Sequence, residues 1–563
     1  MVYIKKIFTL IPYLKLNRFN VIAIYSLLII LYNFSNLNNK IIFNKNLSFI
    51  NFTSYLSAEF ILAFCVLFVF LLLFFFNSIL LKFFIIIFLI VSSCFLYFQL
   101  SYSIIIDELL IASIFETSTM EATGFITYGL IFCVIIFGIL PSIYLVFYIK
   151  IISIKLNKSS LINHSKYFLF YILFLLLLLL ISFLLLPKIY NSDRTIKTSL
   201  SSFMPMNYVA GLYLYETQLK ADYSTKLIDI SKIYPSVWRN KKKYLHNINV
   251  ILVIGESARS DHQSLNGYNI NTNPNLSKLT NLLSFPNVYS CGTNSMYSIS
   301  CMLSQQSKEN FVFPTKETNI ISIFNSLNFH TSVISTNSLY DIKSRQGVKN
   351  NNLNLINLAF KDAKAKYYIN SIRASLPSGE FPFDEYTIPF VINNTKKETN
   401  NFVILYLIGS HAPYEKRHPK SFAKFTCVDT NRCNTYYQDL ISTYDNSILY
   451  TDYVLYKLIK NFDNNNPNNY TLIYYISDHA ENLGENNLYN HGHKYDEQNN
   501  PYLIHIPQFI WVSKPLQKIM GEKYTNLVNK KHMKLNQDYV FHSLLHCIGV
   551  SSKIINPKLS LCN

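Results

Sequence analysis

Acidic and imidazole side chains follow three separate apolar runs in the part of the chain after residue 247. These side chains are Glu256, His411, Asp478, His479 and His491. Carboxylate oxygens and imidazole nitrogens together form a ligand set that suits zinc or manganese. Any one of these residues alone would more often be a helix cap, a solvated side chain or a satisfied core histidine. Their convergence on one rim of a sheet predicts a metal site.

The apolar runs themselves have the length and composition of buried strands. The candidate strands are Val250–Ile254, Thr331–Ser335, Phe402–Ile408, Thr471–Ile476 and Phe509–Val512. The spacing between them leaves room for crossover helices, which predicts an α/β domain with a largely parallel sheet. Open α/β sheets bind ligands at the carboxyl ends of their strands, where Glu256, His411 and Asp478 fall.

A run of hydroxyl side chains could supply a nucleophile for a metal site. The segment SCGTNSMYSISC, residues 290–301, has several serines and one threonine between Cys291 and Cys301. A hydroxyl at the start of a following helix would lie in an environment that favours an anion, and a nearby dication would lower its pKa further. The alternative is a serine-rich loop that a disulfide closes.

The first 187 residues are dominated by apolar runs long enough to cross a bilayer. The five candidate spans are Phe19–Phe34, Leu56–Phe76, Ile79–Leu100, Phe125–Tyr148 and Tyr167–Leu186. A cleaved signal peptide is the alternative for the first, but no small-residue cleavage site follows it. The sequence predicts an all-α bundle of five transmembrane helices.

The placement of basic residues predicts the orientation of this bundle. Lys5, Lys6, Lys15 and Arg18 precede the first span, whereas the loop between the third and fourth spans is acidic and has no basic residue. The N-terminus is therefore expected in the cytoplasm. Five spans then place the remainder on the far side.

Cysteine usage and charge agree with an exported domain. Six of the nine cysteines follow the spans, and Cys291 with Cys301 and Cys427 with Cys433 could close small loops, while Cys547 with Cys562 is left as a third pair. Zinc binding by these cysteines is disfavoured, because no CxxC pair is present. The formal charge of +18 points to an anionic membrane surface or a phosphorylated glycolipid as partner. An exported domain excludes nucleic acid.

The chain therefore divides into three expected parts. These are the transmembrane domain (1–187), a polar linker at the membrane surface (188–247) with a short interfacial helix around Phe203–Lys220, and a periplasmic catalytic domain (248–563). The sequence leaves the oligomeric state open, a monomer included.

The strings GESAR, SCGTNSMYSISC, GSH and SDHAENLGENNLYNHG resemble those of the membrane phosphoethanolamine transferases. That family includes lipid A modifying enzymes and mobile colistin resistance enzymes. The resemblance runs through nearly the whole chain. It implies an alkaline-phosphatase-like or sulfatase-like α/β fold, one tightly bound zinc ion with a second left open and manganese less favoured, and a covalent phosphoethanolamine intermediate.

The resemblance also implies roles for individual residues. Glu256, Asp478 and His479 match the zinc ligands, and His411 and His491 match histidines beside the phosphate. The nucleophile, which would also bind the metal, falls on Ser295, where the family commonly has Thr, and this departure keeps Thr293 as a second candidate.

A donor-binding array is implied nearer the membrane. The family's Asn-x3-Thr-x3-Glu array corresponds to Ser113, Thr117 and Glu121, with Ser in place of Asn. Spacing by four places the three on one helical face, and a carboxylate suits the ethanolamine ammonium. A solvated acidic loop is the alternative. Lys343 is a further candidate for a phosphate contact, although its surroundings depart from the family pattern by about one residue.

The expected activity is transfer of phosphoethanolamine from phosphatidylethanolamine to lipid A at the bacterial inner membrane, with polymyxin resistance as the consequence. Core sugars, periplasmic glucans and proteins are alternative acceptors. A lipoteichoic-acid-type phosphoglycerol transferase and a catalytically silent membrane sensor are the rival functions. A sulfatase activity is disfavoured because no CxPxR-type signature is present.

Overall fold

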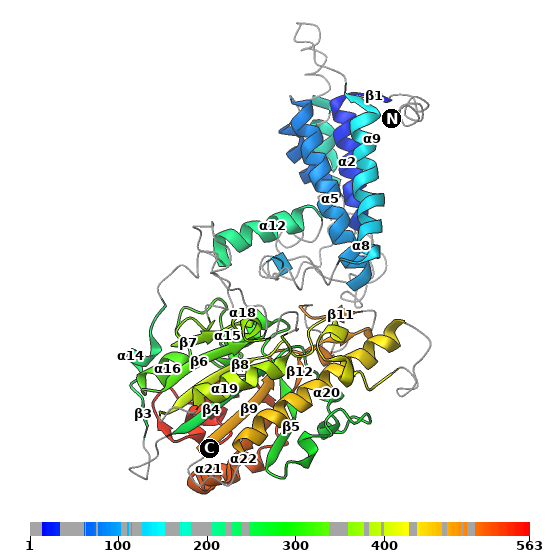
Figure 1. The fold of residues 1–563 in the computed structure, drawn as a ribbon. Coiled ribbons are helices and arrows are strands. Elements are labelled where there is room, and N and C mark those ends of the chain that lie inside the picture. Colours follow the sequence, from blue (N-terminus) through cyan, green and yellow to red (C-terminus); the bar gives the residue numbers. More distant parts are fainter. Residues whose placement is uncertain are drawn as a thin grey trace. The chain divides into compact units, whose positions relative to one another are not determined.

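The computed structural model separates the chain into two compact units, which are described individually (Figure 1). One contains residues up to Phe115 and Thr119–Gln218, and the other contains Glu116–Ser118 and Leu219–Asn563. The described residues are 14–33, 61, 64–74, 77–102, 110–111, 114, 126–151, 169–170, 172–178, 180–181, 204–219, 227–238, 247–336, 359–376, 382–395, 399–426, 436–463, 470–485, 488–492 and 501–563.

Apolar helices build the N-terminal unit. Two of the predicted spans are present as helices long and apolar enough to cross a membrane, at Ser78–Ser101 and Tyr128–Phe147. The elements are α2 (Arg18–Leu31), α5 (Ser78–Tyr102), α8 (Tyr128–Cys133), the π-helical η2 (Val134–Ile139) and α9 (Leu140–Phe147). Helix α2 is a shorter version of the first predicted span. Of the second and fifth, residues 64–72 and 172–178 are helical, and the rest of these spans lies largely outside the described residues.

Two polar side chains hold this apolar unit together. Lys82 Nζ donates to the carbonyl oxygens of Leu145 and Ile149, at 2.8 and 3.0 Å, where α9 ends. A cation suits the unpaired carbonyls at a helix C-terminus. Asn33 exchanges hydrogen bonds with the backbone N–H and carbonyl of Met204, which fixes the start of α12 (Met206–Leu214) beside the bundle. Helix α12 and η3 (Tyr215–Leu219) form the short helix that the sequence predicted around Phe203–Lys220.

A small parallel β-pair was not predicted in this unit. Strand β1 (Leu14–Leu16) pairs with β2 (Ile149–Ile151), which brings the chain before α2 against the chain after α9. Three-residue strands carry too little periodicity to be recognised in sequence.

An eight-stranded mixed sheet forms the centre of the C-terminal unit. In spatial order its strands are β13 (Leu535–Asn536), β5 (Leu282–Tyr289), β12 (His505–Val512), β9 (Tyr470–Ser477), β4 (Ile248–Gly255), β8 (Asn401–Tyr406), β6 (His330–Ser335) and β7 (Ala365–Tyr367). All five predicted strands are present. The prediction of a largely parallel sheet needs one correction, because β12 runs antiparallel to both β9 and β5.

Both faces of the sheet are buried, as β4 shows most clearly. Its side chains alternate between two apolar clusters, with Val250 and Leu252 in one and Ile251 and Val253 in the other. The first cluster contains residues of α16 (Ile320–Ser326) and α23 (Tyr539–Cys547), and the second contains residues of α20 (Tyr436–Phe462). Burial on both faces explains why the strand reads as a continuous apolar run.

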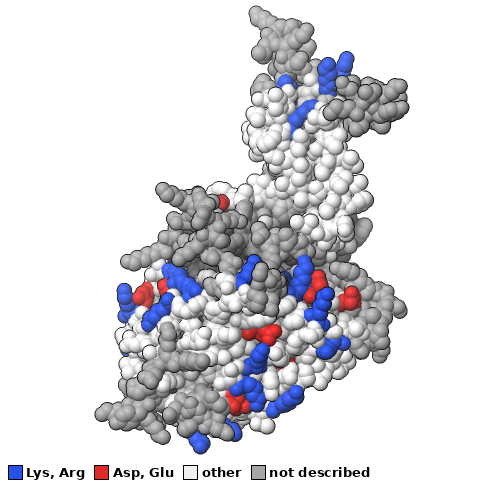
Figure 2. Space-filling model, viewed as in Figure 1, with Lys and Arg blue, Asp and Glu red and all other residues white. Residues whose placement is uncertain are grey.

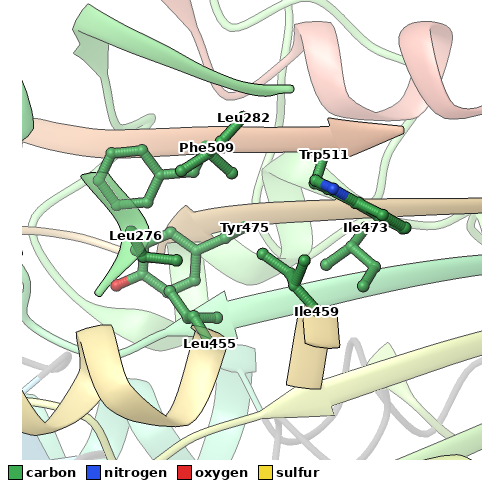
Figure 3. Close-up of a pocket in the computed structure, with 8 residues that line it drawn as sticks. All are labelled: Leu276, Leu282, Leu455, Ile459, Ile473, Tyr475, Phe509 and Trp511. Carbon is green, nitrogen blue, oxygen red and sulfur yellow. The ribbon is translucent and has the colours of Figure 1, made fainter. Parts of the chain in front are cut away.

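A cavity of about 10 Å³ remains on the α20 face (Figure 3). It is lined by Leu276, Leu282, Leu455, Ile459, Ile473, Tyr475, Phe509 and Trp511. Its volume is at the lower limit for a single water, and its walls are almost entirely apolar. This cavity is a packing void, and the candidate chemistry lies elsewhere.

Two disulfides are present among the described residues. Cys291–Cys301 confirms the predicted pair, and Cys547–Cys562, which the sequence left open, is also formed. The predicted Cys427–Cys433 pair lies outside the described residues. Cys65, Cys94 and Cys133 in the N-terminal unit are free thiols.

The Cys547–Cys562 bridge should stabilise the C-terminal domain substantially. It closes a loop with a sequence separation of 15, for which the loss of chain entropy in the unfolded state predicts about 3 kcal/mol. We expect Cys547→Ser with Cys562→Ser to lower the free energy of unfolding by about that amount in denaturant titrations. Tryptophan fluorescence is a selective probe, because Trp238 and Trp511 both lie in this unit. Cys133→Ser is the control, and equal stabilities for the two variants would contradict the prediction.

Candidate metal centre

Three neighbouring parallel strands deliver the acidic and imidazole side chains to one edge of the sheet. In the pairing of β4 with β9, Gly255 lies opposite Ser477. Glu256 and Asp478 each follow that pair by one residue, so their carboxylates leave the sheet side by side. His411 follows β8 on the other side of β4. His491 comes after the short hairpin of β10 (Asn482–Leu483) and β11 (Tyr489–Asn490).

The first cluster consists of Glu256, Asp478, His479 and Ser295. His479 Nε2 lies 3.3 Å from Glu256 Oε1 and 3.4 Å from Asp478 Oδ2. Ser295 is the first residue of α15 (Ser295–Met302), and its Oγ lies 3.2 Å from both Glu256 Oε2 and His479 Nε2. One ligand atom from each of Glu256, Asp478 and His479 lies within 4.8 Å of the others, which is close enough to share one ion.

A second cluster shares Glu256 and adds two histidines. Ligand atoms of Glu256, His411 and His491 also lie within 4.8 Å of one another. His411 Nδ1 lies 2.7 Å from the carbonyl oxygen of Ala412, and His491 Nδ1 lies 3.1 Å from Glu481 Oε1. Because both partners are acceptors, each Nδ1 carries the hydrogen. This assignment leaves Nε2 of each ring free to bind a cation or exchange a proton.

The backbone around Glu256 is unusually close-packed. A Cβ on Gly409, which has φ +50°, would lie 2.9 Å from the backbone N and O of Glu256. Only glycine fits there, which explains the glycine of the GSH string. The buried Asp384 carboxylate accepts from the N–H groups of Ile408 and Gly409, both at 3.0 Å, and so fixes this turn. Ser257 adopts φ +57°, a conformation that non-glycine residues keep mostly at functional sites.

The donor set fits a divalent cation. Asp478 Oδ2 is buried and accepts no hydrogen bond from the described residues. His479 donates from Nδ1 to the carbonyl oxygen of Ala480 at 3.0 Å, so Nε2 is the ring nitrogen that faces the carboxylates. A buried carboxylate oxygen without a hydrogen-bond donor is costly, and a bound cation would remove that cost.

Family models match most of each of the two units. The model described as Sulfatase matches residues 248–550, just over half of the chain, and the model described as Phosphoethanolamine transferase EptA/EptB matches residues 63–219. The chain belongs to the phosphoethanolamine transferase family, and its C-terminal domain is a sulfatase-family domain. The predicted sulfatase-like fold is thereby confirmed.

Individual relatives agree with this assignment. Phosphoethanolamine transferase EptA of Escherichia coli K12 is 28% identical over 83% of this chain and 82% of its own length. Kdo(2)-lipid A phosphoethanolamine 7''-transferase of the same strain is 26% identical over 62% of this chain and 60% of its own length. The structure of the integral membrane protein lipooligosaccharide phosphoethanolamine transferase A from Neisseria meningitidis superposes with a TM-score of 0.76 at 21% identity, over 95% of this chain and 98% of that chain. At that identity the superposition shows a common fold.

Burial makes the ionisation states of this family member's site interdependent. Burial and the nearby Glu256 carboxylate raise the pKa of Asp478 to about 7. Burial opposes a charge on His479, but Asp478 and Glu256 together raise its pKa to about 10. The hydrogen bond and charge of His479 hold the pKa of Glu256 well below its ordinary value despite burial. Without a metal, a proton on His479 therefore balances the carboxylates.

The structure brings together six of the ten site residues that the sequence predicted. They are Glu256, Ser295, His411, Asp478, His479 and His491. The backbone carbonyl of the other nucleophile candidate, Thr293, accepts from Gly492 N at 2.7 Å, and the Ser295 hydroxyl is the one that contacts Glu256 and His479. Ser113, Thr117, Glu121 and Lys343 lie outside the described residues.

Tyr406, the last residue of β8, is a further residue of the site that the sequence did not indicate. Its hydroxyl donates to Glu256 Oε2 at 2.5 Å. Burial and the Glu256 charge raise the pKa of Tyr406 well above its ordinary value, so the phenol keeps its proton and acts as a donor. A tyrosine within an apolar strand reads as a core residue, and only its place one strand away from Glu256 could have indicated this contact.

Removing the Tyr406 hydroxyl should weaken metal binding without unfolding the domain. Hydrogen-bond partners of metal ligands are worth about 10- to 100-fold in metal affinity or activity, so Tyr406→Phe should raise the Kd for zinc by about that factor. Tyr474→Phe is a matched control, because Tyr474 is equally buried in β9 but donates to Gln508. Competition with a chromogenic chelator measures both Kd values. Equal affinities in the two variants would show that the Tyr406 hydroxyl does not support Glu256.

Proposed function

We propose that this chain transfers phosphoethanolamine from phosphatidylethanolamine to lipid A through a covalent intermediate on Ser295, with zinc as cofactor. The observation that carries the proposal is the position of Ser295 Oγ, 3.2 Å from both Glu256 Oε2 and His479 Nε2 at the start of a helix. Family membership supports the group transferred. Lipid A as acceptor is supported by the similarity to Kdo(2)-lipid A phosphoethanolamine 7''-transferase.

The first half-reaction would be an in-line displacement at the donor phosphorus. Ser295 Oγ forms a bond to phosphorus as the bond from phosphorus to the diacylglycerol oxygen breaks. Ser295 is the first residue of α15, where the positive end of the helix dipole would favour the developing negative charge. A zinc ion held by Glu256, Asp478, His479 and Ser295 would supply stabilisation of that charge and a lower pKa for the serine hydroxyl.

The second half-reaction would regenerate Ser295. A phosphate oxygen of lipid A attacks the phosphorus of the intermediate, and Ser295 Oγ leaves. His411 and His491 are suited to proton transfer in both steps, because each Nδ1 has an acceptor and each ring offers one nitrogen atom to the cluster around Glu256. One of them would protonate the diacylglycerol oxygen as it leaves.

Donor recognition is proposed for Ser113, Thr117 and Glu121, with Lys343 as a phosphate contact. A carboxylate and two hydroxyls on one helical face are complementary to an ethanolamine ammonium. We also propose the three-part division into a bundle of five transmembrane helices (1–187), a surface linker (188–247) and a periplasmic domain (248–563). The basic residues that precede the first span support a cytoplasmic N-terminus.

Ser295→Ala should abolish transfer while the domain stays folded. Loss of a covalent nucleophile should lower the rate at least ~10³-fold. Incubation with phosphatidylethanolamine, followed by peptide mass spectrometry, should find phosphoethanolamine on the peptide that contains Ser295. Mass spectrometry of lipid A from cells with and without the gene tests the acceptor.

Thr293→Ala is the control for this assignment, because Thr293 shares the disulfide-closed loop. It should retain activity, and Ser295→Thr should also retain activity because it keeps the hydroxyl. Label on Thr293, or turnover by Ser295→Ala, would overturn the nucleophile and leave the metal site standing.

Glu121→Ala should separate donor binding from metal binding. We expect loss of transfer, because the carboxylate would no longer pair with the donor ammonium, with the zinc content of the purified protein unchanged. Glu121→Gln should be almost as inactive, since it keeps the shape of the side chain but removes the negative charge that would pair with the donor ammonium. Wild-type activity in Glu121→Ala would favour a solvated acidic loop.

A further inference from the structure

The proposed nucleophile and the metal ligands come from loops on different strands of the sheet. Ser295 follows β5, whereas Asp478 and His479 follow β9. Strand β12 lies between these two strands in the sheet, so the strand pairing itself does not join their ends. The distance from Ser295 Oγ to the ligands therefore depends on contacts between the loops.

Gln537 connects the two loops from behind the site. It follows β13, it has no exposed surface, and its side chain reaches both loops. Its Oε1 accepts from Cys291 N at 2.8 Å, and its Nε2 donates to the carbonyl oxygens of Ser477 and Asp478 at 2.8 and 2.5 Å. A primary amide has two N–H donors and one carbonyl acceptor, and all are used here.

The backbone of Gln537 is itself fixed to the strand that leads to Ser295. Its N–H donates to the carbonyl oxygen of Tyr289 at 3.1 Å, and β13 pairs with the end of β5. The neighbouring Asp538 accepts from Lys308 N at 2.9 Å, and Lys308 Nζ donates to the carbonyl oxygen of Ser290 at 2.8 Å. The turn at residues 537–538 thus holds both residues at which the Ser295 loop begins.

A displacement at Cys291 would be transmitted to Ser295. Only three residues separate the two, and the Cys291–Cys301 disulfide joins the start of the loop to the far end of α15. The loop therefore has little freedom to compensate for a shift at its first residue.

We propose that Gln537 is a positioning residue that sets the distance between Ser295 Oγ and the metal ligands. This inference rests on the proposed function of Ser295. Gln537 is not a metal ligand, because its side-chain amide is occupied by hydrogen bonds to backbone groups of the two loops, one N–H and two carbonyl oxygens. Gln537 would affect the reaction by fixing the positions of the two loops. Misplacement of a reacting group by about 1 Å costs on the order of 100-fold in rate.

The chain offers a matched control for simple loss of a buried amide. Gln508 in β12 is equally buried and lies in the same sheet, and its Oε1 accepts from Tyr474 at 3.0 Å. Its Nε2 has no hydrogen-bond partner among the described residues, and its hydrogen bond with Tyr474 does not involve the Ser295 loop. Gln537→Met and Gln508→Met therefore make the same chemical change, but only Gln537→Met removes the link between the two loops.

The experiment compares these variants as full-length protein in detergent, with Gln537→Asn as a milder second variant. Asparagine keeps the amide but is one methylene too short to reach both loops. We expect Gln537→Met to lower the single-turnover rate of Ser295 labelling by roughly 10- to 100-fold, with KM for phosphatidylethanolamine within about twofold of wild type. Gln537→Asn should show the same pattern. Gln508→Met should label at the wild-type rate, even where its Tm falls as much.

A second readout does not depend on activity. The absorption bands of cobalt(II) report the geometry of its ligands, so we expect Gln537→Met loaded with cobalt to differ from wild type, and Gln508→Met to match it. Unchanged cobalt spectra and wild-type labelling in Gln537→Met would overturn the positioning role. Absence of label on Ser295 in the wild-type protein would instead overturn the proposed function, and the cobalt spectra would still decide the role of Gln537.

Discussion

Burial of charge at the carboxyl edge of the sheet is the constraint on which the site depends. Glu256, Asp478 and His479 have almost no exposed surface, so water cannot balance their charges. In such a place a carboxylate pair is stable only with a nearby cation or proton. His479 supplies a proton in the metal-free site, as its raised pKa shows. The same arrangement suits a divalent cation, which would replace that proton and could bind Asp478 Oδ2, an oxygen that accepts no hydrogen bond from the described residues.

Sheet topology explains how these charges come to be adjacent. Strands β9, β4 and β8 are parallel neighbours, so their carboxyl ends share one edge, and the pairing of Gly255 with Ser477 fixes the register of the next residues. The strand pairing alone therefore brings the candidate metal ligands close together. Ser295 differs, because it follows β5 beyond the antiparallel β12. Its loop is held by a disulfide and by the contacts of the 537–538 turn.

The sequence allowed correct predictions where a single apolar run, or a single residue after such a run, was sufficient evidence. Long apolar runs identified the five strands and the two long membrane helices, and the side chains after three strands identified the ligand cluster. Contacts that depend on side-chain packing between distant elements could not be read in the same way. Tyr406 and Gln537 look like a core residue and a loop residue until their partners, 150 and 246 positions away, are known. The antiparallel direction of β12 was also hidden, since an apolar run does not record the direction of its strand.

The two units also differ in what their polar side chains do. In the described part of the N-terminal unit, Lys82 and Asn33 are engaged with backbone groups at helix ends, where they stabilise the bundle. In the C-terminal unit, Glu256, Asp478 and His479 also have hydrogen-bond partners nearby, but His479 lies within 3.4 Å of both carboxylates, and Ser295 lies 3.2 Å from two of the three groups. Hydrogen bonds to backbone groups are typical of structural roles, whereas ionisable side chains that face one another without solvent are typical of reactive sites. This contrast points to the C-terminal unit as the place of the candidate metal chemistry.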